Sequence, residues 1–132
     1  MSKTILVVDD SPSEVRVMLS ALEGRGYQLL TASDGEEALM KNKGFRPDLI
    51  LLDLRLPRID GMTVLGEIKS APQLKSIPVV VLTSSDADPD VGQAYLRHTN
   101  SYLVKPLDLV SFEGLMKELG LYWFTWNQSP RP

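Results

Sequence analysis

The sequence contains no cysteine, a single histidine, no cluster of basic residues and no apolar run long enough to span a bilayer. The absence of cysteine excludes disulfides and thiolate metal sites, and the N-terminus lacks a basic segment followed by a secretory apolar stretch. With 14 basic and 17 acidic residues, and a net charge of −3, the chain has no Lys/Arg block that would follow a nucleic-acid backbone. We therefore expect a cytoplasmic protein that contacts neither nucleic acid nor a membrane directly.

The chain does contain a repeated pattern of short apolar runs that end on polar residues. The four runs end on Asp9, Asp53, Thr83 and Lys105. Continuous runs of β-branched residues and leucine are typical of buried strands in a parallel sheet, and such sheets bind ligands at the carboxyl ends of their strands. One edge of the sheet should therefore gather these four side chains together with Asp10.

Amphipathic segments separate the apolar runs and predict helices. Ser11-Pro12-Ser13-Glu14 offers a capping serine, a proline at the first helical position and a glutamate that can reach back to the cap. Further elements are a strand at Tyr27–Ala32 and helices from Asp34-Gly35, closed by Gly44 with Pro47, from Asp60-Gly61, from Pro89 to His98 and from about Leu107. At 132 residues this predicts one α/β domain, a doubly wound five-stranded parallel sheet of order 2-1-3-4-5 with five helices.

Three carboxylates are expected to meet at this edge, because strands one and three are neighbours in that order. Asp9, Asp10 and Asp53 would repel one another in a partly desolvated pocket unless a cation lies among them. Their oxygen ligands suit Mg²⁺ first and Mn²⁺ second. The alternative, two helix-capping aspartates and an unrelated surface aspartate, leaves their recurrence at strand ends unexplained.

A metal ion held there would leave one carboxylate placed to attack phosphorus. Asp53 is the candidate because it ends the central apolar run. Lys105 and the Thr83 hydroxyl would supply a cation and a neutral donor for the charge on transferred phosphoryl oxygens. A solvated strand-end lysine is the commoner interpretation of such a residue, and only its coincidence with the acids favours a role for Lys105.

These motifs resemble those of the receiver domains of two-component response regulators. The matching segments are Asp9-Asp10, Asp53-Leu54-Arg55-Leu56-Pro57 followed by Asp60-Gly61, Thr83-Ser84 and Lys105-Pro106. The resemblance covers residues 3 to about 120. It predicts a receiver domain at residues 1–120 and an aromatic C-terminal tail at residues 121–132, with no output domain.

The resemblance implies a flavodoxin-like fold and phosphorylation of Asp53 by a sensor histidine kinase. It implies that Mg²⁺ is held by Asp10, Asp53 and the Arg55 backbone carbonyl, with Asp9 assisting through water. The chain would then be a signalling module limited to self-phosphotransfer and autodephosphorylation, rather than an enzyme for an outside substrate.

The same resemblance implies a cis peptide bond before Pro106, which is uncommon even for proline. It also assigns a two-state switch to Thr83, which would follow the phosphoryl group, and Tyr102, which would reorient. Without the resemblance, Thr83 would be a helix cap and Tyr102 a packed strand aromatic.

The final residues concentrate aromatic side chains, namely Tyr122, Trp123, Phe124 and Trp126, which include both tryptophans. Such a patch favours an interface over self-packing. The ending resembles stand-alone receivers that partner bacterial phytochromes and pair as homodimers, so a homodimer and a role in light signalling are expected. The alternative for the whole chain is a phosphorylation-independent protein-binding or dimerisation module, against which the intact acceptor set argues.

Overall fold

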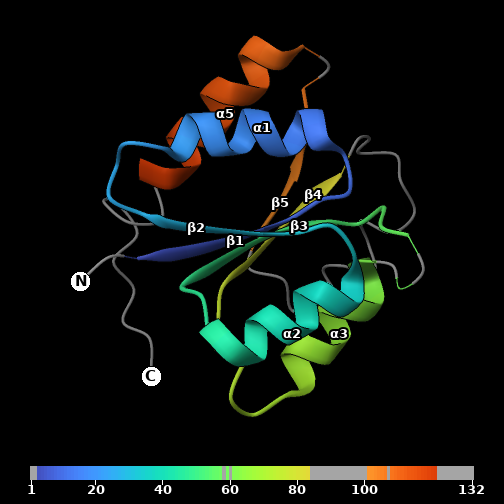
Figure 1. The fold of residues 1–132 in the computed structure, drawn as a ribbon. Helices are drawn as coiled ribbons and strands as arrows, with labels where there is room; N and C mark the ends of the chain where they lie inside the picture. The colour runs from blue at the N-terminus through green and yellow to red at the C-terminus, as the bar shows by residue number, and fades with distance from the viewer. Residues whose placement is uncertain (1–2, 58, 60, 84–100, 107, 122–132) are drawn as a thin grey trace.

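The computed structural model describes residues 3–57, 59, 61–83, 101–106 and 108–121. Its strands are β1 (Thr4–Val8), β2 (Gln28–Ala32), β3 (Leu49–Asp53), β4 (Val79–Thr83) and β5 (Ser101–Val104). Its described helices are α1 (Pro12–Leu22), α2 (Gly35–Phe45), α3 (Gly61–Ser70) and α5 (Leu109–Leu121). The strands pair in parallel in the order β2-β1-β3-β4-β5. Helices α1 and α5 cover one face of the sheet and α2 and α3 the other (Figure 1), which confirms the predicted α/β class.

Both faces of the sheet are buried, and this explains the uninterrupted apolar runs. Side chains of a strand alternate between the two faces. The cluster on one face includes Leu6, Ile50, Leu52, Leu65 and Ile68, and the cluster on the other includes Ile5, Leu49, Leu51, Phe112 and Met116. All five residues of β3 are buried, so its carboxyl end is held firmly in the middle of the sheet.

Helix α1 begins where the capping motif predicts. The Ser11 hydroxyl accepts a hydrogen bond from the backbone N–H of Glu14 at 3.4 Å, and Pro12 is the first helical residue. Helix α2 begins in the same way, with the Asp34 carboxylate accepting from the backbone N–H of Glu37 at 2.8 Å. The two helices that flank the acidic strand ends are therefore started by local hydrogen bonds that the sequence specifies.

The end of α2 lies between its two predicted stop residues, Gly44 and Pro47. The helix continues through Gly44, which is exposed, and ends at Phe45. Arg46 adopts the left-handed conformation with φ 47°, and its backbone N–H donates to the carbonyl of Asn42 at 3.0 Å. Pro47 explains this end point, because a proline disfavours the right-handed helical conformation in the residue before it. Of the two predicted stop signals, the proline therefore determines where α2 ends, and the helix continues through the glycine.

The final helix begins two residues after the predicted position. The Asp108 carboxylate accepts a hydrogen bond from the backbone N–H of Ser111 at 2.7 Å, so α5 starts at Leu109 with Asp108 as its cap. No helix in the described part of the chain is both long and apolar enough to cross a bilayer. The helix predicted from Pro89 to His98 lies outside the described residues and stays a prediction.

Gly61 packs against the backbone at the end of β3, and its replacement by alanine should destabilise the protein. A Cβ atom there would lie 2.5 Å from the carbonyl oxygen of Asp53 and 2.6 Å from the Cα of Leu54. We expect Gly61→Ala to lower the free energy of unfolding by about 1–3 kcal/mol, because neither backbone atom can move freely. Gly44→Ala is the matched control: no atom lies within 4 Å of that Cβ, and it should raise stability by about 0.5–1 kcal/mol.

Urea unfolding of both variants measures the difference. Equal stability of Gly61→Ala and the original protein would show that the loop after β3 can move away from the helix.

Candidate functional site

The parallel register brings the chemically important side chains to one edge of the sheet. Strands β1 and β3 are paired, so Asp9, which directly follows β1, lies beside Asp53, the last residue of β3. Lys105 directly follows β5 and emerges at the same edge, because every strand pair is parallel. The edge predicted from the sequence is therefore the edge where these residues lie.

Three carboxylates form a compact cluster at this edge. Asp9, Asp10 and Asp53 each offer an oxygen atom, and these atoms all lie within 4.8 Å of one another. Asp9 is 1% exposed and Asp53 5% exposed, whereas Asp10 is open to solvent. A set made only of carboxylate oxygens, partly buried and open on one side, suits a hard divalent cation that keeps some of its waters. The donor set thus fits Mg²⁺ or Mn²⁺.

Lys105 lies against the acids rather than in solvent. Its ammonium nitrogen is 3.2 Å from Asp9 Oδ2 and 3.4 Å from Asp53 Oδ2. The residue is 8% exposed, so these ion pairs are shielded from water. The interpretation of Lys105 as a solvated strand-end lysine is therefore wrong, and the cation predicted beside Asp53 is present.

A fourth carboxylate, which the sequence analysis did not assign to the site, contacts the same lysine. Glu14 Oε2 lies 2.9 Å from Lys105 Nζ, the shortest of the three ion pairs that this lysine makes with described residues. Glu14 was expected to reach back to the cap of α1, and its backbone N–H does bond to Ser11, but its side chain turns to Lys105 instead. The sequence signal that could have assigned Glu14 to the site was its position in the first turn of the helix that follows Asp9 and Asp10.

Backbone N–H groups orient two of the acids. The N–H of Ser11 donates to Asp9 Oδ1 at 2.9 Å, and the N–H of Arg55 donates to Asp53 Oδ1 at 3.2 Å. In each case the donor lies two residues after the acceptor, where the chain turns away from the strand. The turn after each strand therefore holds one carboxylate oxygen and leaves the second oxygen turned toward Lys105.

Burial dominates the electrostatics of the site. Burial raises the pKa of Asp9 to about 7, against the opposing effects of the Ser11 N–H and the Lys105 charge, while Asp53 and Glu14 add to the rise. Burial likewise raises the pKa of Asp53 despite the nearby Lys105. Burial alone would lower the pKa of Lys105, but the charges of Asp53, Glu14 and Asp9 together raise it. The carboxylates of the site therefore carry more negative charge than the single Lys105 ammonium neutralises.

The raised pKa of Asp9 should make the protein less stable as the pH rises. An acid whose pKa is higher in the folded state stabilises that state while it is protonated, and this stabilisation is lost as the pH rises through the folded-state pKa. Between pH 5 and pH 8, without divalent cations, we expect a loss of about 3 kcal/mol from Asp9, since about two pH units lie below a pKa of about 7. Urea unfolding at several pH values measures this slope. Asp9→Asn should flatten it, and an unchanged slope in that variant would contradict the assignment.

The Lys105–Pro106 peptide bond differs from the form that the resemblance implies. No cis peptide bond occurs among the described residues, which include both of these positions, so this bond is trans. The trans form is the lower in free energy for a bond before proline, by about 0.5–1 kcal/mol. With this trans bond, the Lys105 ammonium reaches all three of its carboxylate partners.

The structure places the remaining predicted residues only in part. Thr83 ends β4 and pairs with Val104 of β5, and Tyr102 lies within β5, but the side chains of both lie outside what the structure describes. The predicted interface residues lie wholly outside the described residues; they are Tyr122, Trp123, Phe124 and Trp126. Their roles therefore stay predictions.

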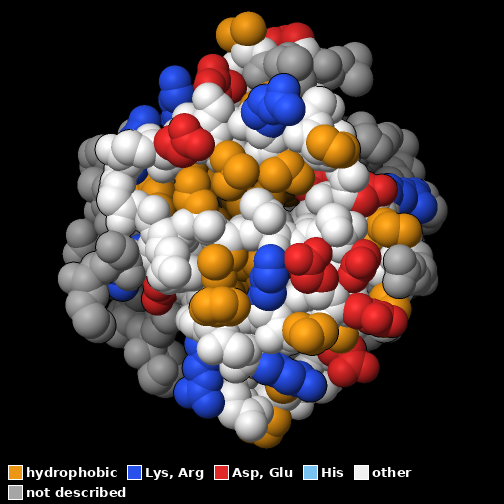
Figure 2. All heavy atoms as spheres, viewed as in Figure 1, with side chains coloured by type: hydrophobic (Ala, Val, Ile, Leu, Met, Phe, Trp, Pro, Cys, Tyr) orange, Lys and Arg blue, Asp and Glu red, His pale blue; other side chains and the backbone are white. Residues whose placement is uncertain are grey.

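An open hollow lies beside the acid cluster. Its volume is about 220 Å³, and its lining includes Asp9, Asp10, Ser33 and Glu37. Acidic side chains gather on the side of the molecule where β1 and β2 end, at the right of the view in Figure 2. A small anionic reactant would meet this negative surface, so a cation at the cluster would assist its approach.

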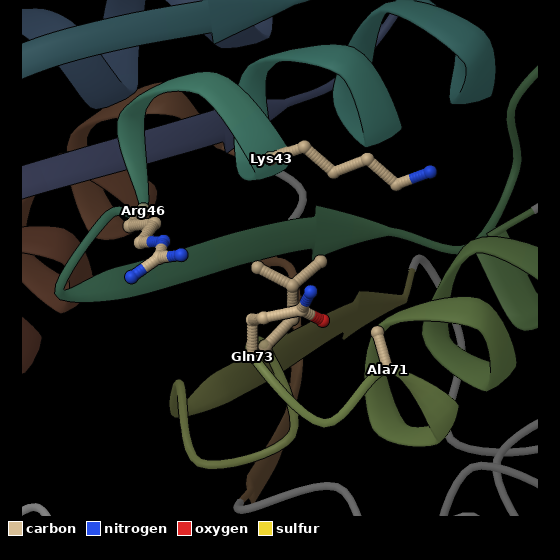
Figure 3. Close-up of a pocket in the computed structure, with 5 residues that line it drawn as sticks. Lys43, Arg46, Ala71 and Gln73 are labelled. Atoms are coloured by element: carbon tan, nitrogen blue, oxygen red, sulfur yellow. The ribbon is translucent and has the colours of Figure 1, made fainter.

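A second hollow lies at the other end of α2. Lys43 and Arg46 from the end of α2, with Ala71, Gln73 and Leu74 from the segment after α3, enclose about 170 Å³ (Figure 3). Its described lining residues carry basic and amide groups and no carboxylate. This hollow shares no lining residue with the one beside the acid cluster.

Known proteins resemble this chain over nearly its whole length. A family model described as a response regulator receiver domain matches residues 5–116. The probable methanogenesis regulatory protein FilR2 of Methanothrix harundinacea is 41% identical over 136 residues, which cover 97% of this chain and 88% of FilR2. Response regulator Rcp1 of Synechocystis is 39% identical over 130 residues, which cover 92% of this chain and 88% of Rcp1.

Two solved structures are similar as well. The phosphorylated cyanobacterial phytochrome response regulator RcpA has a TM-score of 0.93 and 36% identity, covering 100% of this chain and 99% of its own. The Mn²⁺-bound form of Rcp1 has a TM-score of 0.87 and 36% identity, covering 98% of this chain and 99% of its own. The likeness therefore extends from sequence to fold.

Proposed function

This chain belongs to the response regulator receiver domain family, and from that premise we propose that it accepts a phosphoryl group on Asp53 from a sensor histidine kinase. The family is one of signalling modules rather than enzymes that turn over outside substrates. The observation that carries the proposal is the Asp53 carboxylate, buried within a cluster of acids and 3.4 Å from the Lys105 ammonium. Asp9 has the same neighbours, and it is the resemblance to the family that assigns Asp53 to the phosphoryl group and Asp9 to the metal.

The transfer needs a nucleophile, which is the ionised Asp53 carboxylate, and stabilisation of the charge on the phosphoryl oxygens. An oxygen of Asp53 forms the new bond to phosphorus while the bond from phosphorus to the donor breaks, and its electron pair leaves with the donor. The Lys105 ammonium then faces the oxygens of the transferred group, and the Thr83 hydroxyl is proposed to donate to one of them. The product is an acyl phosphate on Asp53.

The acid cluster is proposed to hold Mg²⁺, with Mn²⁺ as a substitute. Asp10, Asp53 and the Arg55 carbonyl would be direct ligands, and Asp9 would act through water. The bound ion would neutralise charge on the phosphoryl oxygens during transfer. Three carboxylates within 4.8 Å support this, and a related protein, Rcp1, has been solved in a Mn²⁺-bound form.

Signalling would follow from a change of conformation and of protein contacts. We propose that Thr83 and Tyr102 respond to the phosphoryl group, and that the aromatic tail from Tyr122 onward helps to form a homodimer. The resemblance to RcpA, a cyanobacterial phytochrome response regulator, supports a role in phytochrome light signalling.

The test is phosphoryl uptake from a small donor. Incubation of the pure protein with acetyl phosphate and Mg²⁺ should add one phosphoryl group, measured as intact mass, and hydroxylamine should remove it. A metal chelator should prevent the uptake. Absence of uptake with Mg²⁺ present would favour the alternative, a protein-binding module that works without phosphorylation.

A further inference from the structure

Glu14 forms an ion pair with Lys105, the lysine that is proposed to donate to the phosphoryl group. A lysine ammonium has three N–H donors, and Lys105 faces three carboxylates, with Glu14 the nearest at 2.9 Å, followed by Asp9 at 3.2 Å and Asp53 at 3.4 Å. It donates hydrogen bonds to Glu14 and Asp9 and forms a longer ion pair with Asp53, so three carboxylates hold the ammonium before any phosphoryl group arrives. A phosphoryl group on Asp53 would share the ammonium with these carboxylates, and weakening one of these contacts would let Lys105 move toward the phosphoryl oxygens.

The contact with Glu14 is the one that can be released at the lowest cost. The Asp9 side chain is fully buried and that of Asp53 is 7% exposed, so neither can exchange the ammonium for water. The Glu14 side chain is 32% exposed and can turn outward. It also lies in the first turn of α1, where the partial positive charge of the helix N-terminus favours a carboxylate with or without a lysine partner.

We propose that Glu14 is a releasable competitor for Lys105: it holds the ammonium in the unphosphorylated protein and so slows phosphoryl uptake on Asp53. This inference rests on the proposed function. Glu14 is a positioning residue that acts through Lys105 and touches neither the donor nor the reacting atoms. Its negative charge, 2.9 Å from the Lys105 ammonium, would also repel an anionic phosphodonor, which acts in the same direction.

The test compares rates of uptake from acetyl phosphate. In the transfer the Asp53 oxygen bonds to phosphorus, and the acetate leaves with the electron pair of the broken bond. Glu14→Gln keeps the size of the side chain and removes the charge, so we expect uptake about fivefold faster than in the original protein, as for the loss of one partly exposed ion pair. Glu36→Gln is the matched control, because Glu36 is an exposed acid in the first turn of α2, and it should leave the rate unchanged.

A double variant tests whether Glu14 acts through the lysine. In a Lys105→Met background, Glu14→Gln should no longer accelerate uptake by the same factor, because there is no ammonium to release. Unchanged or slower uptake in the single variant would overturn the inference, even if the double variant does not fold. Equal acceleration in both backgrounds would also overturn it.

Measuring the original protein and Asp53→Asn in the same assay distinguishes the proposed function from the role of Glu14. Uptake that depends on Asp53 but is not accelerated by Glu14→Gln contradicts only the role of Glu14. No uptake by the original protein contradicts the proposed function and the inference together.

Discussion

Asp53→Asn should abolish phosphoryl uptake from acetyl phosphate. The amide has the shape of the carboxylate but lacks the charged oxygen that attacks phosphorus, and no second described acid lies at the end of β3. We expect no gain of mass under conditions that fully phosphorylate the original protein. Because burial raises the pKa of Asp53, its replacement by a neutral group should also leave the fold intact at neutral pH.

The matched control is Asp108→Asn. Asp108 is an exposed cap of α5, and asparagine caps a helix about as well as aspartate, so this variant should accept one phosphoryl group at the original rate. Uptake by Asp53→Asn at an undiminished rate would falsify the assignment of the acceptor. Peptide mapping after hydroxylamine treatment would then locate the true acceptor.

Lys105→Met should have the largest effect on stability. It leaves Asp9, Glu14 and Asp53 around a methionine, and removing one partner of a buried ion pair costs about 3–5 kcal/mol. We expect this loss at pH 8 without divalent cations, and a smaller loss at pH 5, where Asp9 takes up a proton. Addition of Mg²⁺ should restore part of the stability, because the ion replaces the missing positive charge.

Urea unfolding with and without Mg²⁺ measures both effects. Lys117→Met, an exposed lysine of α5, is the control and should change stability by less than about 0.5 kcal/mol. Phosphoryl uptake by Lys105→Met, where the variant is folded in the presence of Mg²⁺, should be slower by about a factor of 100 or more. Equal stability of the two lysine variants would show that the acids do not depend on Lys105.

The local signals in the sequence were sufficient for the strands and most helix starts. Each buried strand is an unbroken apolar run because both faces of the sheet are covered, and the starts of α1 and α2 follow from hydrogen bonds within four residues. The end of α2 follows from Pro47, one of its two predicted stop signals, which acts through the backbone of Arg46. The start of α5 lies two residues after the predicted position at about Leu107, because Asp108 caps the helix.

The acid cluster was predicted for a different reason, namely topology. Once the strands are known to be parallel and in the order found here, Asp9, Asp10 and Asp53 must approach one another at one edge. The trans bond before Pro106 could not be predicted in this way, because the two forms differ by about 1 kcal/mol or less and the surroundings decide between them.

The amino-acid sequence alone determined the fold class, the carboxylates at the strand ends and the lysine beside them, because these depend on hydrophobic patterning and on the parallel order of the strands. Only the tertiary structure decided which carboxylates contact the Lys105 ammonium. Glu14 and Lys105 are 91 residues apart, and whether a side chain at the start of α1 turns to its own cap or to Lys105 depends on how the helix packs over the strand ends. No local sequence pattern predicts which of these partners the Glu14 side chain contacts, because the contact depends on distances of a few ångströms between segments far apart in the chain.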